Sequence, residues 1–101
     1  MLGKTANGLY WMYRYLERAE STARLIDTGQ RIALTRSNDS DDEWMSVLKA
    51  ASVYQAFKAN YETLTKDAAI DWMLRSGDNP SSVLSLVKSA RHNARMVRTA
   101  L

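Results

Sequence analysis

Apolar side chains recur every three or four residues near both ends of this sequence, which is the period of an α-helix. Near the start they form the row Met12, Leu16, Ala19, Ala23, Ile26. Near the end they form the row Val83, Val87, Ala90, Ala94, Val97, Leu101. Helix-breaking residues are rare, with one proline and four glycines in 101 residues. The pattern therefore predicts an all-α protein.

Local start and stop signals divide the chain into about four helices. Pro80 suits the first helical position after Asn79, and Gly77 suits the left-handed residue that ends a helix. The expected helices run from about Thr5 to Thr35, from Glu43 to Leu64, from Thr65 as N-cap to Ser76, and from Asn79 as N-cap to Leu101, with a polar connection at 37–42. Short connections between consecutive helices predict an antiparallel up-down bundle of about four helices whose first helix is long.

Each long helix also carries a charged row beside its apolar row. In both helices the charged row is displaced from the apolar row in the same rotational sense. Antiparallel packing is therefore expected to bring Glu17 and Glu20 of the first helix opposite Arg91 and Arg95 of the last helix. Arg24 is expected to join them through its i,i+4 pair with Glu20. Two interpretations stay open: solvated ion pairs worth about 0–1 kcal/mol each, or a partly buried site whose arginines bind a carboxylate or phosphate. The candidate polar site comprises Glu17, Arg18, Glu20, Arg24, Arg91 and Arg95.

Composition removes most catalytic and metal-binding classes. The sequence has no cysteine, which excludes disulfides, thiolate metal sites and cysteine nucleophiles. Its single histidine, His92, has no obvious acid nearby, and no Glu-x-x-His pair or glycine-rich phosphate loop occurs. We therefore expect neither a metal nor a cofactor. No apolar run approaches a membrane span and no secretory signal is evident, which favours a cytoplasmic protein with no membrane partner.

Charge distribution leaves nucleic-acid binding as a lesser alternative. The chain carries 14 basic and 11 acidic side chains, a net charge of +3. Segment 79–101 has no acidic residue, and its basic row is Lys88, Arg91, Arg95, Arg98. These residues come late in the last helix, whereas helix-turn-helix proteins contact bases near the N-terminal end of the recognition helix. The row therefore gives only weak support for a nucleic-acid partner.

Two features suggest that further helices complete the fold. The expected first helix would be about 45 Å long. It contains Gly8 and Gly29, each of which lowers helix stability by a tolerable amount. The last helix reaches Leu101 without a stop signal. Trp72 is expected in the core, whereas Trp11 and Trp44 could also serve further contacts. We expect the uncovered surface to meet other helices of a longer protein or a second copy of the chain.

Two segments resemble the bacterial alpha-E domain family. The opening of that family is similar to TANGLYWM (5–12), RYLERAE (14–20) and TARL (22–25), with Glu17-Arg18 as the Glu-Arg motif. Its second signature is similar to NPSSV (79–83), ARHNAR (90–95) and VR (97–98). Two positions depart from the family: His92 stands where Glu is common, and Tyr13 where a small residue is usual.

The resemblance implies a single helical domain over 1–101 that forms the N-terminal portion of a longer alpha-E-like protein. It also implies a place in a peptide synthesis or modification system, beside ATP-grasp ligases and transglutaminase-like proteases. We expect a non-enzymatic accessory or recognition role. The alternative is an enzyme that makes or hydrolyses amide bonds with Glu17 as acid or base.

Overall fold

The computed structural model describes residues 2–35 and 40–100, and this part of the chain contains five α-helices and no strand. The helices are α1 (Leu2–Thr35), α2 (Ser40–Ala50), α3 (Tyr54–Asn60), α4 (Lys66–Leu74) and α5 (Val83–Ala100). The predicted all-α fold and long first helix are therefore confirmed. Half of the predicted polar connection, 37–39, and the final Leu101 lie outside the described residues, whereas α2 already begins at Ser40.

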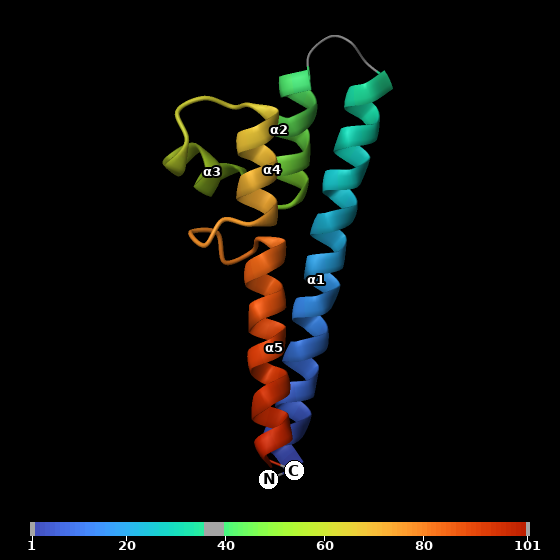
Figure 1. Cartoon of the computed structure of the whole chain (residues 1–101), viewed down its shortest axis with the longest axis vertical. Helices are drawn as coiled ribbons and strands as arrows, with labels where there is room; N and C mark the ends of the chain where they lie inside the picture. Colours follow the sequence, from blue (N-terminus) through green and yellow to red (C-terminus); the bar gives the residue numbers. More distant parts are fainter. Residues whose placement is uncertain (1, 36–39, 101) are drawn as a thin grey trace.

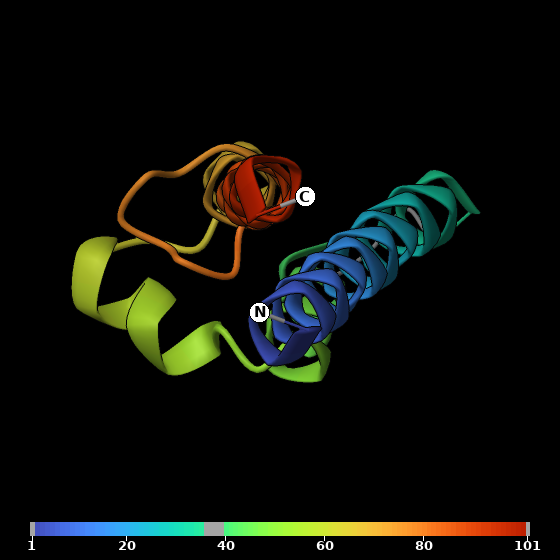
Figure 2. The same ribbon diagram turned by 90° about the horizontal axis from the view of Figure 1, so that it is seen from below.

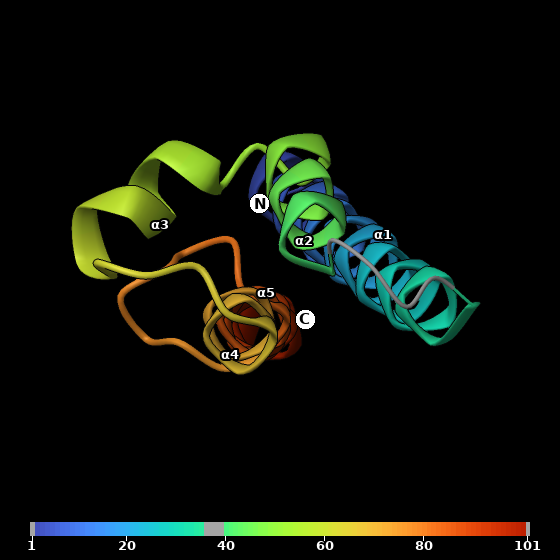
Figure 3. The same ribbon diagram turned by 90° about the horizontal axis from the view of Figure 1, so that it is seen from above.

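The helices form an elongated molecule, 55 Å long and 15 Å across its shortest axis. Helix α1 runs along the whole length, α2 returns beside its C-terminal half, and α4 and α5 follow one another along the other side (Figure 1). Views along the long axis show α4 and α5 almost in line, with α3 at the edge away from α1 (Figures 2 and 3). The antiparallel packing of the first and last helices is as predicted.

The hydrophobic core lies at one end of this arrangement. Its buried members are Ile26, Trp44, Val47, Leu48, Val53, Phe57, Ala69, Trp72 and Met73. Tyr61 stacks on Phe57 at 4.7 Å between ring centroids and meets the edge of Trp72 at 5.8 Å. Trp44 is fully buried and Trp72 nearly so, whereas Trp11 is 42% exposed. Two of the three tryptophans are thus core anchors, and Trp72 is one of them, as predicted.

The segment predicted as one helix from Glu43 to Leu64 is in fact two helices. Helix α2 ends in a Schellman motif, in which the N–H of Val53 donates to the carbonyl of Leu48 and the N–H of Ser52 to that of Lys49, each at 3.0 Å. Ser52 has φ 61°, the left-handed conformation that glycine usually supplies there. Because no glycine marks the break, the sequence prediction missed it.

The connection between α4 and α5 also differs from the prediction. Helix α4 begins as expected, because Thr65 Oγ1 accepts the N–H of Ala68. However, α4 ends at Leu74, and no described glycine, Gly77 included, has a positive φ. The cap of α5 is Ser82, whose Oγ accepts the N–H of Ser85 at 3.1 Å.

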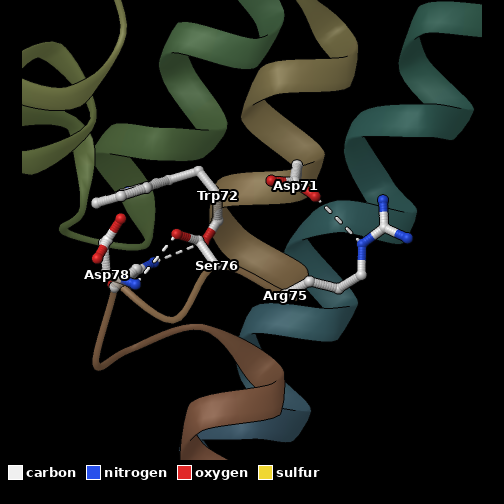
Figure 4. Close-up of polar contacts among 6 residues, drawn as sticks. Asp71, Trp72, Arg75, Ser76 and Asp78 are labelled. Carbon is white, nitrogen blue, oxygen red and sulfur yellow. Dashed lines mark hydrogen bonds and ion pairs between the residues drawn. The ribbon is translucent and has the colours of Figure 1, made fainter.

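Asn79, which we predicted to be the cap of α5, instead ties this connection to α4. Its side chain is 2% exposed, donates to the carbonyl of Trp72 at 2.9 Å, and accepts the N–H of Ser81 at 3.0 Å. Figure 4 shows this turn, with Asp78 N–H directed at Ser76 Oγ and the ion pair of Asp71 and Arg75 on α4. Because the Asn79 side chain makes this tertiary hydrogen bond with Trp72, it does not cap α5 as the sequence predicted.

Candidate functional site

The carboxylates of the predicted polar site pair within α1. Glu17 lies 3.6 Å from Arg14, and Glu20 is paired with Arg24 as predicted for i,i+4 neighbours. These side chains are between half and four-fifths exposed. Among the described residues, neither carboxylate forms an ion pair with Arg91 or Arg95. The predicted ion pairs between the first and last helices are therefore not formed.

One cause is the register of α1 against α5. Gly8 lies beside Val97, and Arg18 lies beside Ser81 at the start of α5. Counting from these two contacts places Glu17 level with 82–88, so Arg91 comes three to nine residues later, about 5–14 Å along the axis. Glu17 and Arg91 therefore lie at different levels, and Glu17 pairs with Arg14 of its own helix.

The second cause is the face that each helix buries. In α1 the buried face includes Gly8, Ala19, Thr22, Ile26 and Gly29. The predicted apolar row is rotated from this face by roughly 50°. Consequently Leu16 on α1 and Val87 on α5 are 41% and 42% exposed, and the charged rows turn to solvent. The small residues that allow close approach decide the buried face, not the largest apolar ones.

Arg18 of the candidate set does reach the segment that precedes α5. Its guanidinium Nη2 donates to Ser81 Oγ at 2.8 Å. Ser81 is held in turn by its N–H, which donates to the buried Asn79 side chain. The hydrogen bond thus joins the two segments that carry the resemblance to alpha-E proteins. Reasoning from helical rows missed Ser81, because the residue precedes α5 and lies on no helical face.

A pocket of about 250 Å³ opens beside this hydrogen bond. It lies where α1, the end of α2 and the start of α5 meet. Its polar lining is Arg14, Glu17, Arg18, Ser21, Thr22 and Ser81, and its apolar lining is Leu25, Ala50, Ala51 and Leu86. We call it the Glu-Arg pocket. It includes two residues of the predicted set, Glu17 and Arg18, and adds Arg14 and two serine hydroxyls that the prediction did not include.

The remaining predicted residues lie elsewhere. Glu20 and Arg24 are exposed on α1 outside the pocket lining. Arg91 lines an apolar depression between α1 and α5, and Arg95 is exposed on α5. The structure therefore divides the six candidates between two surfaces instead of uniting them.

The described residues contain neither a metal-binding cluster nor a membrane-spanning helix. Residues 2–35 and 40–100 contain no group of three or more histidine, cysteine, aspartate or glutamate side chains placed to hold a metal ion. Within the same ranges, no helix combines the length and apolar character needed to span a membrane.

Comparison with known proteins identifies a family. A search of the curated proteins and a search of the solved structures each found no match. The family described as Alpha-E, a predicted alpha-helical domain with a conserved ER motif, matches residues 1–101. The sequence contains one Glu-Arg dipeptide, Glu17-Arg18, and it lines the pocket described above. The chain belongs to the Alpha-E family.

Proposed function

We propose that this domain is a non-enzymatic recognition module of a peptide synthesis or modification system, and that the Glu-Arg pocket receives a peptide carboxylate. The observation that carries the proposal is the hydrogen bond from Arg18 to Ser81, which fixes one guanidinium at the mouth of a pocket shared by three helices. ATP-grasp ligases and transglutaminase-like proteases are the partners that the resemblance to alpha-E proteins implies.

The pocket chemistry supports a carboxylate ligand. Arg14 and Arg18 are one helical turn apart and both line the pocket. A guanidinium carries five N–H donors in a plane, so Arg18 retains donors beyond the one used by Ser81. Leu25 and Leu86 supply apolar surface beside these cations. A volume of about 250 Å³ lies below that of pockets for drug-sized molecules, which favours a terminal residue or single side chain.

Glu17 is the carboxylate that a ligand would have to displace from Arg14. Its carboxylate is 3.6 Å from Arg14, a loose ion pair with both side chains at least half exposed. Exposed pairs of this kind contribute about 0–1 kcal/mol, so a ligand carboxylate can displace Glu17 from Arg14 at small cost. Charge-assisted hydrogen bonds from two arginines are worth more than that pair.

Binding of acetyl-alanyl-alanine with a free C-terminal carboxylate tests this proposal, with the C-terminal amide of the same peptide as the control ligand. Backbone amide shifts in two-dimensional NMR should change around Ser21 and Ser81, for the free acid only. Arg18→Gln should weaken binding about tenfold, since it removes a charge-assisted hydrogen bond. Arg24→Gln, an exposed arginine on the same helix outside the pocket, should leave the affinity unchanged. Equal binding of acid and amide would refute the proposal.

The enzymatic alternative rests on the same pocket, because Glu17 lies there with the hydroxyls of Ser21 and Ser81. A general acid or base needs a reacting group within hydrogen-bond reach. Glu17→Gln distinguishes the two functions when amide-bond formation is assayed with the full protein and its ligase partner. Loss of turnover with unchanged peptide binding would favour catalysis by Glu17, whereas unchanged turnover supports recognition.

A further inference from the structure

An apolar groove runs between α1 and α5 on a face separate from the Glu-Arg pocket. It is lined by Met12 and Leu16 of α1 and by Val87, Ala90, Arg91 and Ala94 of α5, and encloses about 210 Å³. Leu16 and Val87 are each about two-fifths exposed. All of its lining side chains except Arg91 are apolar.

This groove lies in the half of the molecule that consists of α1 and α5 alone. Helices α2, α3 and α4 gather at the opposite end, as Figure 1 shows. Two packed helices cannot cover one another's outward faces, so no third element from the described part of the chain lies over the groove. Helix-in-groove recognition uses this geometry, with an apolar helix face laid between two packed helices.

The rim of the groove is basic. Lys88, Arg91, Arg95 and Arg98 are all exposed on α5, and within the described residues none of them forms an ion pair. Segment 79–101 contains no acidic side chain. On α1, Glu17 lines the Glu-Arg pocket and is paired with Arg14, and Glu20 is already paired with Arg24. Within residues 2–35 and 40–100, no ion pair therefore compensates the positive charge along α5.

We propose that this groove binds an amphipathic helix that carries acidic residues along one edge. Its apolar side chains would enter between Leu16 and Val87, and its carboxylates would meet Arg91 and the basic side chains beside it. A second copy of this chain is less suitable, because its α1 carboxylates are already paired and it would bring another unpaired basic row. Nucleic acid would neutralise the basic row but leave the apolar lining uncovered.

A fluorescent helical peptide of about 20 residues, long enough to fold in isolation, provides the test. The first probe has leucine at the a and d positions and glutamate at e, so that one edge of its apolar face is acidic. A second has lysine in place of glutamate, and a third has serine in place of leucine. We expect the leucine–glutamate peptide to bind in fluorescence anisotropy, and the other two to bind at least about tenfold more weakly. Added salt should weaken binding, because the charges involved are exposed.

Variants on the two faces of α5 locate the binding site. Val87→Asp should lower the affinity at least about tenfold. Met96→Asp is the matched control, because Met96 is 52% exposed and lies on the opposite face of the same helix. Circular dichroism should show both variants folded, since both side chains already contact water.

Charge reversal tests the basic rim separately. Arg91→Glu should weaken the glutamate peptide about threefold to fivefold and strengthen the lysine peptide, whereas Lys66→Glu, at the start of α4, should change neither.

Three results would overturn the proposal. The first is binding that is indifferent to the sign of the peptide charge or to Val87→Asp. The second is a dimer in light scattering that Val87→Asp dissociates, which would assign the groove to a second copy. The third is duplex DNA that displaces the peptide and binds more tightly than it does. Because the Glu-Arg pocket lies on another face, failure here leaves the carboxylate proposal untouched.

Discussion

Glycine residues decide how closely α1 approaches its neighbours. A Cβ atom added at Gly8 would lie 2.6 Å from Val97 Cγ2, and one at Gly29 would lie 3.0 Å from both Trp44 Cζ3 and Val47 Cγ2. The sequence prediction treated both glycines as costs to helix stability. The structure shows that they are contact points, which explains why the buried face includes them and leaves Leu16 outside.

Substitution of Gly8 by alanine should therefore destabilise the protein. Alanine gains about 0.5–1 kcal/mol in helix propensity, but overpacking against a stiff valine costs about 1–3 kcal/mol. We expect a net loss of about 1 kcal/mol in the free energy of unfolding, measured with urea. Gly3→Ala is the control, because a Cβ there meets nothing within 4 Å. The loss should disappear in a Val97→Ala background, and a Gly8→Ala variant as stable as Gly3→Ala would contradict the contact.

The phenol of Tyr61 should make the stability of the protein depend on alkaline pH. Burial raises its pKa above the ordinary value of 10.0, and the charge and hydrogen bond of Asp71, followed by Asp78, raise it further. The folded state therefore favours the neutral phenol. This stabilisation is fully present below pH 10, where the unfolded state is also neutral, and it is lost as pH rises from there through the folded-state pKa.

Tyr61→Phe should consequently flatten the loss of stability above pH 10. Urea unfolding at a series of alkaline pH values measures this loss, and ultraviolet absorbance follows ionisation of the phenol in the folded protein. Tyr10→Phe, which removes an exposed phenol from α1, is the matched control and should retain the contribution of Tyr61. Parallel pH profiles for the wild type and Tyr61→Phe would exclude this explanation.

At the level of the helix, the break between α2 and α3 depends on one strained residue. Ser52 adopts φ 61° so that the Schellman motif can place Val53 against Leu48, both buried in the core. A non-glycine residue pays about 1 kcal/mol or more in this conformation. Ser52→Gly should raise the free energy of unfolding by about 0.5–1 kcal/mol, and Ser52→Val should lower it by more than 1 kcal/mol. A Ser52→Val variant as stable as Ser52→Gly in thermal unfolding would contradict this explanation.

Helix boundaries were predictable where local chemistry alone sets them. Thr65 caps α4 because no tertiary partner competes for its side chain among the described residues, so the local signal and the structure agree. The sequence around Asn79 is typical of a helix cap, but its side-chain amide donates to the carbonyl of Trp72. Ser82 caps α5 instead. A single sequence gives no information on such a tertiary partner.

The candidate site was likewise predictable only in part. Glu17 and Arg18 were identified, because the Glu-Arg motif is visible in the sequence. Ser81, the partner of Arg18, and the separation of Glu17 from Arg91 were not, because both depend on the register of α1 against α5 and on the faces that the two helices bury. That register is set by Gly8 against Val97, a contact that no apolar periodicity reveals.

At the scale of the whole molecule, packing is unequal along the 55 Å axis. The five largest fully buried side chains, Trp44, Trp72, Phe57, Leu48 and Met73, all lie within the end formed by α2, α3 and α4. At the other end only α1 and α5 of the described helices pack together, and the small residues Gly8 and Ala90 let them approach closely, with Val97 against Gly8. Fewer buried apolar contacts mean a smaller free energy for local opening, so the two ends should not open together.

Amide hydrogen exchange should reveal this difference. Amides of Trp11–Tyr15 in α1 and Arg91–Arg95 in α5 lie more than a turn from the helix ends, so terminal fraying does not account for their exchange. We expect them to exchange at least about tenfold faster than amides of Val47–Leu48 and Trp72–Met73, a difference of about 1.4 kcal/mol in opening free energy. The acidic amphipathic peptide should slow exchange in the first two segments only, because it adds apolar contacts where the helix pair has fewest. Uniform protection along the axis would mean that the small-residue contacts between α1 and α5 are as resistant to opening as the aromatic core, and that the groove between them needs no further helix.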